Sequence, residues 1–483
     1  MDHIIRDISD LFAGYRSETI LSISKIPQSG SIRIYYRIRT ASGSFIATHG
    51  INIKENQSFI KFSRHFKKTG CPVPEIFAIN SEGTIYLQED FGDISLLNRL
   101  EEAGPVDEVY ELFRKSLKAL SHLQIKGNEG LDYENYCLTS SEFGKQAILS
   151  DLLYFKYYFL DTLQLPYDKE KLVSDFEIFS SKLGNTSHKY FMFRDFQSRN
   201  ILVENEKVHF IDYQGGMKGA LQYDVASILW QAKAELSEAW KHGLLEYYMD
   251  CVEEELGVPF KKKEFVQQYQ GYVLIRLMQV LGAYGFRGLF ERKAHFLVSI
   301  PLGLKNLRSF LRQYTMGETV PEFERILHLI VEDQIIARFI PPRAGADTAL
   351  VVHINSFSYR KAIPPDPGEN GGGYVFDCRS ILNPGRIQEF KSQTGRDKGV
   401  KDFLEQQTKM PEFLNSVFDL IDISVEDYLN RGFKSLLVNF GCTGGQHRSV
   451  YAADSLARHL KNKFGVTVEL HHTEQEAKGW KNV

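Results

Sequence analysis

The sequence predicts two domains of different architecture: an α+β domain with a small β lobe and a large helical lobe, then a compact α/β domain with a mostly parallel sheet. Short segments with alternating apolar residues fill about the first hundred positions, whereas a 3.6-residue apolar period dominates from about 106 to 310. Beyond a change of composition near 341–347, apolar strands alternate with helices. At 483 residues the chain is also too long for one hydrophobic core.

The first domain begins with short strands around a single helix. That helix should run from Glu55 to Lys68 and end at Gly70 and Pro72. Strands are expected on both sides of it, at 20–26, 33–39, 44–48, 75–79 and 84–88. Longer helices follow at 109–123, 141–162, 169–183 and between 225 and 310, with two short strands at 201–204 and 208–212 among them. This order is that of a protein-kinase-like, bilobal domain.

The second domain follows a linker near 341–347. Strands are expected at 349–356, 374–379 and 434–440, with helices at 398–406, 413–430 and 450–464. The proline- and glycine-rich stretch 364–373 is expected to form a loop between two strands. We therefore divide the chain into a first domain over 1–315, a helix and linker over 316–348, and a second domain over 349–483.

The bulk properties are those of a globular protein without a strongly charged surface. The net charge of −3 draws the chain as a whole toward neither nucleic acid nor acidic membranes. We find no apolar signal segment at the N-terminus and no apolar run that approaches membrane-spanning length. The five cysteines are odd in number, scattered and not spaced like metal ligands. We therefore expect reduced thiols in a cytoplasmic protein.

Residues 194–200, Arg-Asp-Phe-Gln-Ser-Arg-Asn, carry the strongest chemical signal. Asp195 and Asn200 are five positions apart, and Asp212 follows a short strand. Each alone would be an ordinary turn or capping residue, but their joint spacing favours catalysis. The first carboxylate can accept a proton from an attacking hydroxyl, and Asn200 and Asp212 offer hard oxygens to Mg²⁺. Phosphoryl transfer from ATP needs these groups in this order, so we expect a kinase with Asp195 as its base.

Other residues of the β lobe fit a nucleotide site. The turn Ser29-Gly30-Ser31 lies between two strands, where its backbone N–H groups can approach phosphates. Glu55, in the first turn of the expected helix, can pair with a basic group on the sheet. The strand at 44–49 has no lysine for the phosphates, so Arg33 or Arg37 is expected to supply that charge.

The first domain resembles the aminoglycoside phosphotransferase-like kinases, and within them the branch that phosphorylates N-acetylmuramate and N-acetylglucosamine at C1. Besides the catalytic segment, the resemblance is carried over about 1–315 by 30–37 (GSIRIYYR), 71–76 (CPVPEI), 87–93 (LQEDFGD), 223–227 (YDVAS) and 278–284 (MQVLGAY). It implies ATP or GTP as donor, Mg²⁺ as cofactor, an amino sugar as acceptor, and Gln88 and Glu89 beside the nucleotide. The sequence departs from the kinase pattern at Phe193, where catalytic loops usually carry a histidine.

A second phosphate site is expected at the strand-to-helix junction 441–449, Gly-Cys-Thr-Gly-Gly-Gln-His-Arg-Ser. Small residues there let backbone N–H groups converge at a helix N-terminus, and Arg448 can grip a phosphate with two N–H groups. Cys442 and Arg448 also have the C-x5-R spacing of cysteine-dependent phosphatases, in which a thiolate attacks phosphorus. The alternative without a ligand is an ordinary glycine-rich turn.

The second domain resembles the C-terminal domain of the RNase adapter protein family RapZ. The resemblance is carried over about 349–475 by the 441–450 loop and by 355–364 (NSFSYRKAIP), 374–379 (YVFDCR), 383–384 (NP) and 394–398 (TGRDK). It implies a domain that self-associates and senses glucosamine-6-phosphate, with Asp377, Arg379 and Lys398 near the sugar phosphate. The implied loop contacts are Cys442, Thr443, Gly444, Gly445, Gln446, His447, Arg448 and Ser449. RNA binding, which that family shows, is not expected here, because the stretch 474–481 is mixed in charge.

Together these features predict a kinase for a small-molecule hydroxyl, fused to a domain that senses or docks a phosphosugar. Three alternatives stay open. As a RapZ-type adapter, the chain would bind nucleotide without catalysis and recruit RNA or a nuclease. As a phosphatase, it would act through Cys442. As an antibiotic kinase, it would need a strongly acidic pocket for a polycation, and no acidic cluster in the sequence indicates one.

Overall fold

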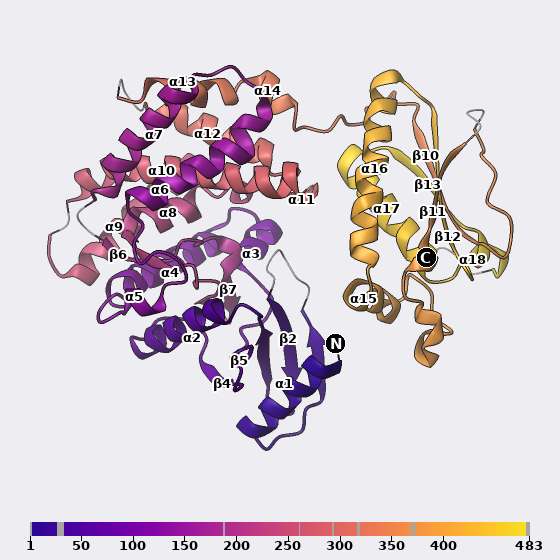
Figure 1. Cartoon of the computed structure of the whole chain (residues 1–483), viewed down its shortest axis with the longest axis horizontal. Coiled ribbons are helices and arrows are strands. Elements are labelled where there is room, and N and C mark those ends of the chain that lie inside the picture. The colour runs from indigo at the N-terminus through magenta and orange to yellow at the C-terminus, as the bar shows by residue number, and fades with distance from the viewer. Residues whose placement is uncertain are drawn as a thin grey trace. The chain divides into compact units, whose positions relative to one another are not determined.

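A computed structural model describes residues 2–26, 33–186, 189–259, 261–291, 294–315, 319–368 and 372–479. The chain forms two compact units (Figure 1). Met1–Glu291 and Phe296–Ile336 form the first, and Ala337–Val483 belongs to the second. The first unit has a small β lobe and a larger helical lobe, and the second is an α/β domain, so both predicted architectures are confirmed.

The small lobe is an antiparallel sheet of five strands in the order β1-β2-β3-β5-β4. One face of this sheet packs on the first helix through Ile8 and Phe12, which share a core with Tyr36 and Ile38. That helix was not predicted. The elements are α1 (Asp2–Tyr15), β1 (Ser22–Lys25), β2 (Ile34–Arg39), β3 (Ser44–His49), α2 (Ile53–Lys68), β4 (Ile76–Ile79) and β5 (Ile85–Glu89).

The larger lobe is helical, with two short antiparallel strand pairs set among the helices. β6 (Lys189–Met192) pairs with β9 (Met217–Ala220), and β7 (Ile201–Glu204) pairs with β8 (Lys207–Phe210). The helix expected over 141–162 is shorter, because a π-helical turn, η1 (Lys156–Leu160), follows it. The helices are α3 (Leu96–Ala103), α4 (Asp107–Ile125), α5 (Tyr133–Tyr136), α6 (Lys145–Phe155), α7 (Lys169–Gly184), α8 (Leu221–Leu229), α9 (Glu238–Leu256), α10 (Lys262–Tyr284), α11 (Ala294–Leu297), α12 (Ile300–Gln313), α13 (Pro321–Ile330) and α14 (Asp333–Ala337).

Within the described residues 319–348, helices α13 and α14 extend the first unit. Phe323 of α13 packs edge-to-face against Phe176 of α7, with ring centroids 5.0 Å apart. The carboxylate of Asp175, also on α7, accepts hydrogen bonds from two backbone N–H groups at the start of α13, at 2.7 and 2.9 Å. The first unit therefore continues to Ile336.

One helical stretch, Lys262–Phe290, is long and apolar enough to cross a membrane by length and composition. It comprises α10 and a π-helical turn, η5 (Gly285–Phe290). The prediction that no apolar run approaches this length is therefore wrong. Of the apolar window, 56% is buried inside the unit, which is the behaviour of a core helix.

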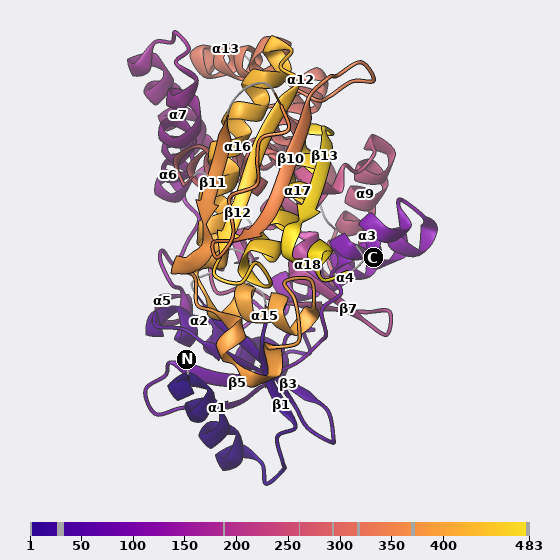
Figure 2. The same cartoon turned by 90° about the vertical axis from the view of Figure 1, so that its right-hand side faces the viewer.

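The second unit is a parallel four-stranded sheet in the order β11-β12-β10-β13, which Figure 2 shows face on. Its strands are β10 (Val351–Ser358), β11 (Gly373–Asp377), β12 (Ser435–Cys442) and β13 (Thr467–His472), of which the last was not predicted. Two helices, α16 (Met410–Arg431) and α17 (Arg448–Phe464), cover one face of the sheet (Figure 1). Two shorter helices, α15 (Lys398–Gln407) and α18 (Thr473–Ala477), complete the unit.

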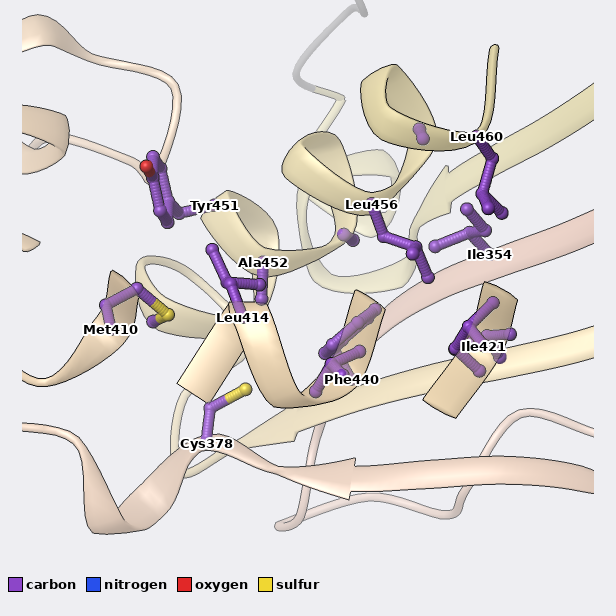
Figure 3. Close-up of a cluster of buried hydrophobic side chains, with 14 of the residues drawn as sticks. Ile354, Cys378, Met410, Leu414, Ile421, Phe440, Tyr451, Ala452, Leu456 and Leu460 are labelled. Atoms are coloured by element: carbon purple, nitrogen blue, oxygen red, sulfur yellow. The ribbon is translucent and has the colours of Figure 1, made fainter. Parts of the chain in front are cut away.

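A single apolar core joins the sheet of this unit to its helices. In Figure 3, Ile354 and Phe440 from the sheet meet Leu414 and Ile421 of α16 and Leu456 of α17. The parallel register aligns the ends of the central strands, with Ser358 opposite Cys442. The loops that follow the strands therefore gather at one edge of the sheet, where α/β folds place their ligands.

Candidate active site and phosphate-binding loop

The catalytic segment follows β6, and a buried aspartate of α8 fixes its backbone. Asp224 accepts hydrogen bonds from the backbone N–H groups of Phe193 at 2.7 Å and Arg194 at 2.9 Å. The amide of Gln124 on α4 donates a third, at 2.9 Å. Burial raises the pKa of Asp224 to about 7, against the effect of these donors. Asp224 therefore positions the backbone of the loop that carries the candidate base.

Arg194 adopts an unusual backbone conformation that its side-chain contacts hold in place. Its φ of 83° lies in the left-handed region, which arginine rarely occupies. The guanidinium donates to both carboxylate oxygens of Asp151, at 2.8 and 2.9 Å, and lies 4.6 Å from the ring centre of Phe143. These contacts bind Arg194 to the helical lobe, while the neighbouring Asp195 keeps 46% of its side chain exposed.

Asp195 has solvent access and an arginine on its carboxylate. Nη2 of Arg276 lies 3.1 Å from Oδ1 of Asp195. Partial desolvation by the surrounding protein raises the pKa of Asp195, but the charges of Arg276, Arg199 and Arg194 outweigh it and lower the pKa below its ordinary value. The carboxylate is thus ionised at neutral pH and able to accept a hydrogen bond from an alcohol.

Arg276 is a functional candidate that the sequence reasoning missed. It lies on α10 with 3% exposure, and its Nη1 donates to Gln279 at 2.7 Å. A buried charge needs a partner, and here that partner is the predicted base. The signal in the sequence was a single arginine within the otherwise apolar run 273–278.

The β7–β8 hairpin brings Asn200 and Asp212 together. The backbone N–H of Ile211 donates to the carbonyl of Asn200 at 3.1 Å. Nδ2 of Asn200 donates to the carbonyl of Asp195 at 2.9 Å, which leaves the amide oxygen for a cation. Oδ1 of Asp212 accepts from Nε2 of Gln214 at 2.9 Å. Both side chains offer hard oxygens of the kind that Mg²⁺ prefers.

A cation at this place would depend on these two side chains. In the described part of the chain, no group of three or more His, Cys, Asp or Glu side chains could hold a metal ion. Mg²⁺ in nucleotide enzymes is commonly held by one or two protein oxygens together with phosphate oxygens and water. The donor set of Asn200 and Asp212 fits that pattern.

Arg33 connects Asp212 to the helix of the small lobe. Its Nη2 lies 2.8 Å from Oδ1 of Asp212, and its Nε lies 3.3 Å from Oε1 of Glu55 on α2. Arg33 immediately precedes β2 and is buried. Of the two arginines considered in place of the missing strand lysine, Arg33 is the one beside a candidate metal ligand.

Arg37 lies farther along β2, at the segment that follows β5. Its guanidinium contacts Asp90 at 2.6 Å and Asp93 at 2.6 Å. A pocket of about 520 Å³ lies beside this group, between the β2–β3 turn and residues 90–93. Arg37 therefore contacts these two carboxylates instead of Asp212. The predicted turn Ser29-Gly30-Ser31 lies outside the described residues.

The two predicted nucleotide residues of β5 differ in their surroundings. The carboxylate of Glu89 pairs with Lys67 at 2.8 Å and accepts the backbone N–H of Glu75 at 3.1 Å. Its side chain thus ties β5 to α2 and β4, and its place beside a nucleotide stays a prediction. Gln88 is buried, and its amide oxygen has no hydrogen-bond partner among the described residues.

Phe193 replaces the usual histidine by apolar packing. Its buried ring meets those of Phe196, Phe210 and Tyr213 edge-on, at centroid distances of 5.2, 6.1 and 5.7 Å. The hydroxyl of Tyr213 lies 2.6 Å from that of Ser63 on α2. This aromatic cluster connects the loop that carries the candidate base to the small lobe, although the histidine usual at position 193 is absent.

In the second unit, the loop after β12 closes around the sulfur of Cys442. The backbone N–H of Gly445 donates to Sγ at 3.2 Å, and the hydroxyl of Ser449 lies 3.2 Å from it. Gly445 has a φ of 63°, and a Cβ there would come within 2.4 Å of Cγ of Glu474. Only glycine fits this turn without strain.

Arg448 begins α17 and lies at the same sheet edge as Asp377 and Arg379. Its Nη1 donates to the carbonyls of Arg379 at 3.2 Å and Ile381 at 2.8 Å. Asp377 ends β11 opposite Gly441 of β12 and pairs with Arg379 at 2.7 Å. The structure therefore brings these three predicted residues together beside the loop.

Three other predicted residues of this unit lie differently. The amide of Gln446 donates to the carbonyls of Lys391 at 3.1 Å and Gln393 at 2.7 Å, and Nε2 of His447 is bonded to the carbonyl of Phe390 at 2.9 Å. These two side chains support the neighbouring segment, and their contact with a phosphosugar stays a prediction. Lys398 is exposed at the start of α15.

Comparison with known proteins gives a match for each unit. Residues 23–256 match the phosphotransferase enzyme family, and residues 350–476 match the RapZ C-terminal domain. A "Nucleotide-binding protein" of Fervidobacterium nodosum is 38% identical over 192 residues, 38% of this chain and 65% of that protein. The chain thus spans less than two thirds of the length of that relative.

One further sequence relative and one solved structure are also similar to this chain. A "Nucleotide-binding protein" of Fusobacterium nucleatum is 31% identical over 212 residues, 42% of this chain and 69% of that protein. An amicoumacin kinase, solved with AMP-PNP, Ca²⁺ and its antibiotic, is 10% identical, with a TM-score of 0.45 over 69% of this chain and 93% of that one. The chain thus contains a phosphotransferase-family domain over 23–256 and a RapZ C-terminal domain over 350–476.

Proposed function

We propose that the first unit transfers a phosphoryl group from ATP to a hydroxyl of a small molecule, and that the acceptor is an amino sugar. One observation carries the proposal: Asn200 is bonded to the backbone of Asp195, and the β7–β8 hairpin sets Asp212 beside Asn200. A base and two cation ligands in this arrangement suit phosphoryl transfer, in which positioning and charge neutralisation do most of the catalysis.

Asp195 would receive the hydroxyl of the acceptor. The carboxylate is exposed enough for an alcohol to reach it. Its lowered pKa makes it a weak base, so it would orient the attacking oxygen and take up the proton late in the reaction. An anomeric hydroxyl is more acidic than the other hydroxyls of a sugar and suits a weak base.

Asn200 and Asp212 would hold Mg²⁺, and Arg33 would face the phosphates of the nucleotide. When bound, Mg²⁺ supplies positive charge to the phosphate oxygens. Arg33 already contacts Asp212 and Glu55, so it would supply the charge that a lysine of β3 provides in other kinases.

The charges around the base favour a neutral or anionic acceptor over a polycation. Arg276 contacts Asp195, and the charges of Arg199 and Arg194 also act on its carboxylate. A polycationic antibiotic would bring like charges toward these arginines. An N-acetylated amino sugar carries no ammonium group, and it is the acceptor implied by the kinase branch that the sequence resembles.

We propose that the second unit binds a sugar phosphate at the loop 442–449 and reports its level to the kinase. The N-terminus of α17, the exposed residues Thr443 and Gly444, and the guanidinium of Arg448 offer donors to a phosphate. Asp377 and Arg379 lie at the same edge. Kinase kinetics should therefore respond to glucosamine-6-phosphate in the full chain and not in a chain ending at Ile336.

A RapZ-type adapter is the second candidate, favoured by the match over 350–476 and by relatives named as nucleotide-binding proteins. In that case the first unit would bind nucleotide without turnover, and the second would self-associate and recruit RNA or a nuclease. A gel shift with structured RNA at physiological salt would detect this activity. We place either activity in the cytoplasm, since all five cysteines are unpaired.

A panel of amino sugars with Mg²⁺ and ATP tests the kinase. We expect phosphorylation of N-acetylmuramate or N-acetylglucosamine, with the modified position read by NMR and no product from Asp195→Asn. If the wild-type protein binds ATP but phosphorylates no sugar of the panel, the kinase proposal fails and the adapter is favoured.

A further inference from the structure

The loop after β12 holds a cysteine in the setting of a nucleophile. The sulfur of Cys442 lies at the base of the loop, 3.2 Å from the N–H donor of Gly445 and 3.2 Å from the hydroxyl of Ser449. We propose that the Cys442 thiolate attacks the phosphorus of a phosphomonoester held in this loop, so that the second unit hydrolyses sugar phosphates. This inference rests on the phosphosugar site proposed above.

Cys442 differs from the other four cysteines in its acidity. Burial raises the pKa of Cys442, but hydrogen bonds from Ser449 and Gly445 and the charge of Arg448 outweigh it and lower the pKa below its ordinary value. Burial raises the pKa of each of the other four cysteines. The pKa rises to about 11 for Cys71 and to about 12 for Cys137, and it is also raised for Cys251 and Cys378. The thiolate is the nucleophilic form, so the loop favours reactivity at this cysteine.

The guanidinium of Arg448 donates hydrogen bonds from Nη1, whereas its Nε has no partner among the described residues. The residue is 4% exposed, and Nη1 donates to the carbonyls of Arg379 and Ile381. Nε has no hydrogen-bond partner among the described residues. A buried donor without a partner is unfavourable, and a phosphate accepting from Nε and Nη2 would satisfy it. The same charge acts on Cys442, so arginine and thiol would serve one ligand.

The backbone of the loop suits the phosphate of such an ester. The loop leads from β12 directly into α17, whose 17 residues give it a helix N-terminus with positive potential. Thr443 and Gly444 are exposed, whereas Cys442 and Gly445 beneath them are buried. The side chain of Ser449, one position into the helix, is directed at the sulfur. The loop 442–449 therefore contains both the donors that would bind the phosphate and the donors that stabilise the thiolate.

The reaction would proceed in two balanced steps. In the first, a sulfur–phosphorus bond forms and the phosphorus–oxygen ester bond breaks. The departing oxygen takes a proton from water and leaves hydroxide. In the second, hydroxide attacks the phosphocysteine, the sulfur–phosphorus bond breaks, and inorganic phosphate and the thiolate are released. One ester and one water give one alcohol and one phosphate, and nothing is oxidised or reduced.

Hydrolysis of p-nitrophenyl phosphate by the full-length protein tests the nucleophile. We expect Cys442→Ser to lower the rate by about 100-fold or more, because a serine hydroxyl is not ionised at neutral pH. The matched control is Cys378→Ser, a buried cysteine after the neighbouring strand β11 whose thiol is protonated. This variant should keep the wild-type rate within about twofold.

Alkylation of the wild-type protein gives a second test that needs no variant to fold. Iodoacetamide should modify Cys442 faster than the other four cysteines, and glucosamine-6-phosphate should protect it. Acid quenching during turnover should also leave one phosphoryl group on the peptide that contains Cys442. A slower reaction at Cys442 than at the other cysteines would overturn the proposal.

Calorimetric binding of glucosamine-6-phosphate separates failure of the nucleophile from failure of the site. Binding without hydrolysis, or equal hydrolysis by wild type and Cys442→Ser, overturns the nucleophile and leaves the phosphosugar site standing. Loss of both binding and hydrolysis overturns the site itself. Binding together with hydrolysis that depends on Cys442 supports both.

Discussion

Nη2 of Arg33 lies 2.8 Å from Oδ1 of Asp212, although the two residues are 179 positions apart. The same guanidinium reaches Glu55 of α2 at 3.3 Å. One buried arginine thus connects the helix of the small lobe to a candidate metal ligand of the large lobe. In protein kinases a lysine of the third strand pairs with that helix, and this chain has no lysine there.

Replacing Arg33 by alanine should therefore impair use of the nucleotide. We expect kcat/KM for ATP to fall by about 10²–10³-fold, the loss typical of one group that stabilises developing charge. Arg33→Lys should recover part of the activity, because it keeps the charge but not the forked geometry. Arg39→Ala, at the exposed end of β2, the strand that Arg33 precedes, is the matched control. Equal kinetics of Arg33→Ala and Arg39→Ala would contradict this role.

Removing Arg276 should change the pH dependence of the kinase. Its positive charge lowers the pKa of Asp195, so Arg276→Met should raise that pKa and move the acid limb of kcat/KM to higher pH. The wild-type enzyme should lose activity at a more acidic pH than Arg276→Met does. Profiles measured between about pH 4 and pH 8 would show the difference.

The lysine variant separates this effect from simple loss of structure. Arg276→Lys keeps a positive charge near the base and should return the acid limb toward its wild-type position. A damaged fold would lower activity at every pH without moving the limb. Identical limbs in wild type and Arg276→Met would show that the arginine does not act on the base.

Restoring the kinase histidine at Phe193 should not improve the enzyme. The ring lies in a buried aromatic cluster, so an imidazole there would be desolvated beside Phe196, Phe210 and Tyr213. We expect Phe193→His to lower the free energy of unfolding by about 1–3 kcal/mol, as for other unsatisfied buried polar groups. Urea unfolding of the two proteins measures this. A more active and equally stable Phe193→His would refute the packing account.

Asp454 should stabilise the second unit at neutral pH. It pairs with Arg396 at 2.9 Å and lies 3.5 Å from His472. Burial raises the pKa of Asp454, but His472 and Arg396 lower it to about 2. Because this value is below the ordinary 3.8, the ionised form stabilises the fold above that pH, by about 2 kcal/mol.

That contribution should vanish on acidification. As the pH falls from 3.8 to about 2, the folded protein also takes up the proton and the stabilisation is lost. Calorimetry of wild type and Asp454→Asn should show a gap in unfolding free energy at neutral pH that closes in this window. A gap of constant size throughout would assign the effect to packing instead of charge.

Much of the fold followed from local patterns. The strands and helices of both units repeat their apolar residues with clear periods, and most predicted elements occur with small changes of bounds. Helix α1 was missed although Ile5, Ile8 and Phe12 recur at helical spacing, because the strands that follow dominate the composition of that region. Strand β13 was missed because only two of its six residues, Val468 and Leu470, are apolar side chains packed against the core.

The sequence predicts those candidate site residues whose spacing along the chain is characteristic of one kind of chemistry. Asp195, Asn200 and Asp212 have a spacing that few other functions need. Arg276 contacts Asp195 from 81 positions away, and only the packing of α10 determines that distance. His447 belongs to the predicted phosphate loop, but its side chain is bonded to the backbone carbonyl of Phe390. That contact could not be predicted from the local sequence, because Phe390 is 57 positions away.

The central claim is that Asp195 acts on the acceptor while Asp212 acts on the cation, and parallel titration of both variants tests it most directly. Mg²⁺-dependent ATP affinity and turnover of an N-acetylated amino sugar would be measured on the same samples. Asp195→Asn should bind ATP as wild type does, with turnover reduced about 10²–10⁴-fold. Asp212→Asn should lose the dependence of ATP affinity on Mg²⁺. Undiminished turnover in Asp195→Asn, or wild-type Mg²⁺ dependence in Asp212→Asn, would contradict the account.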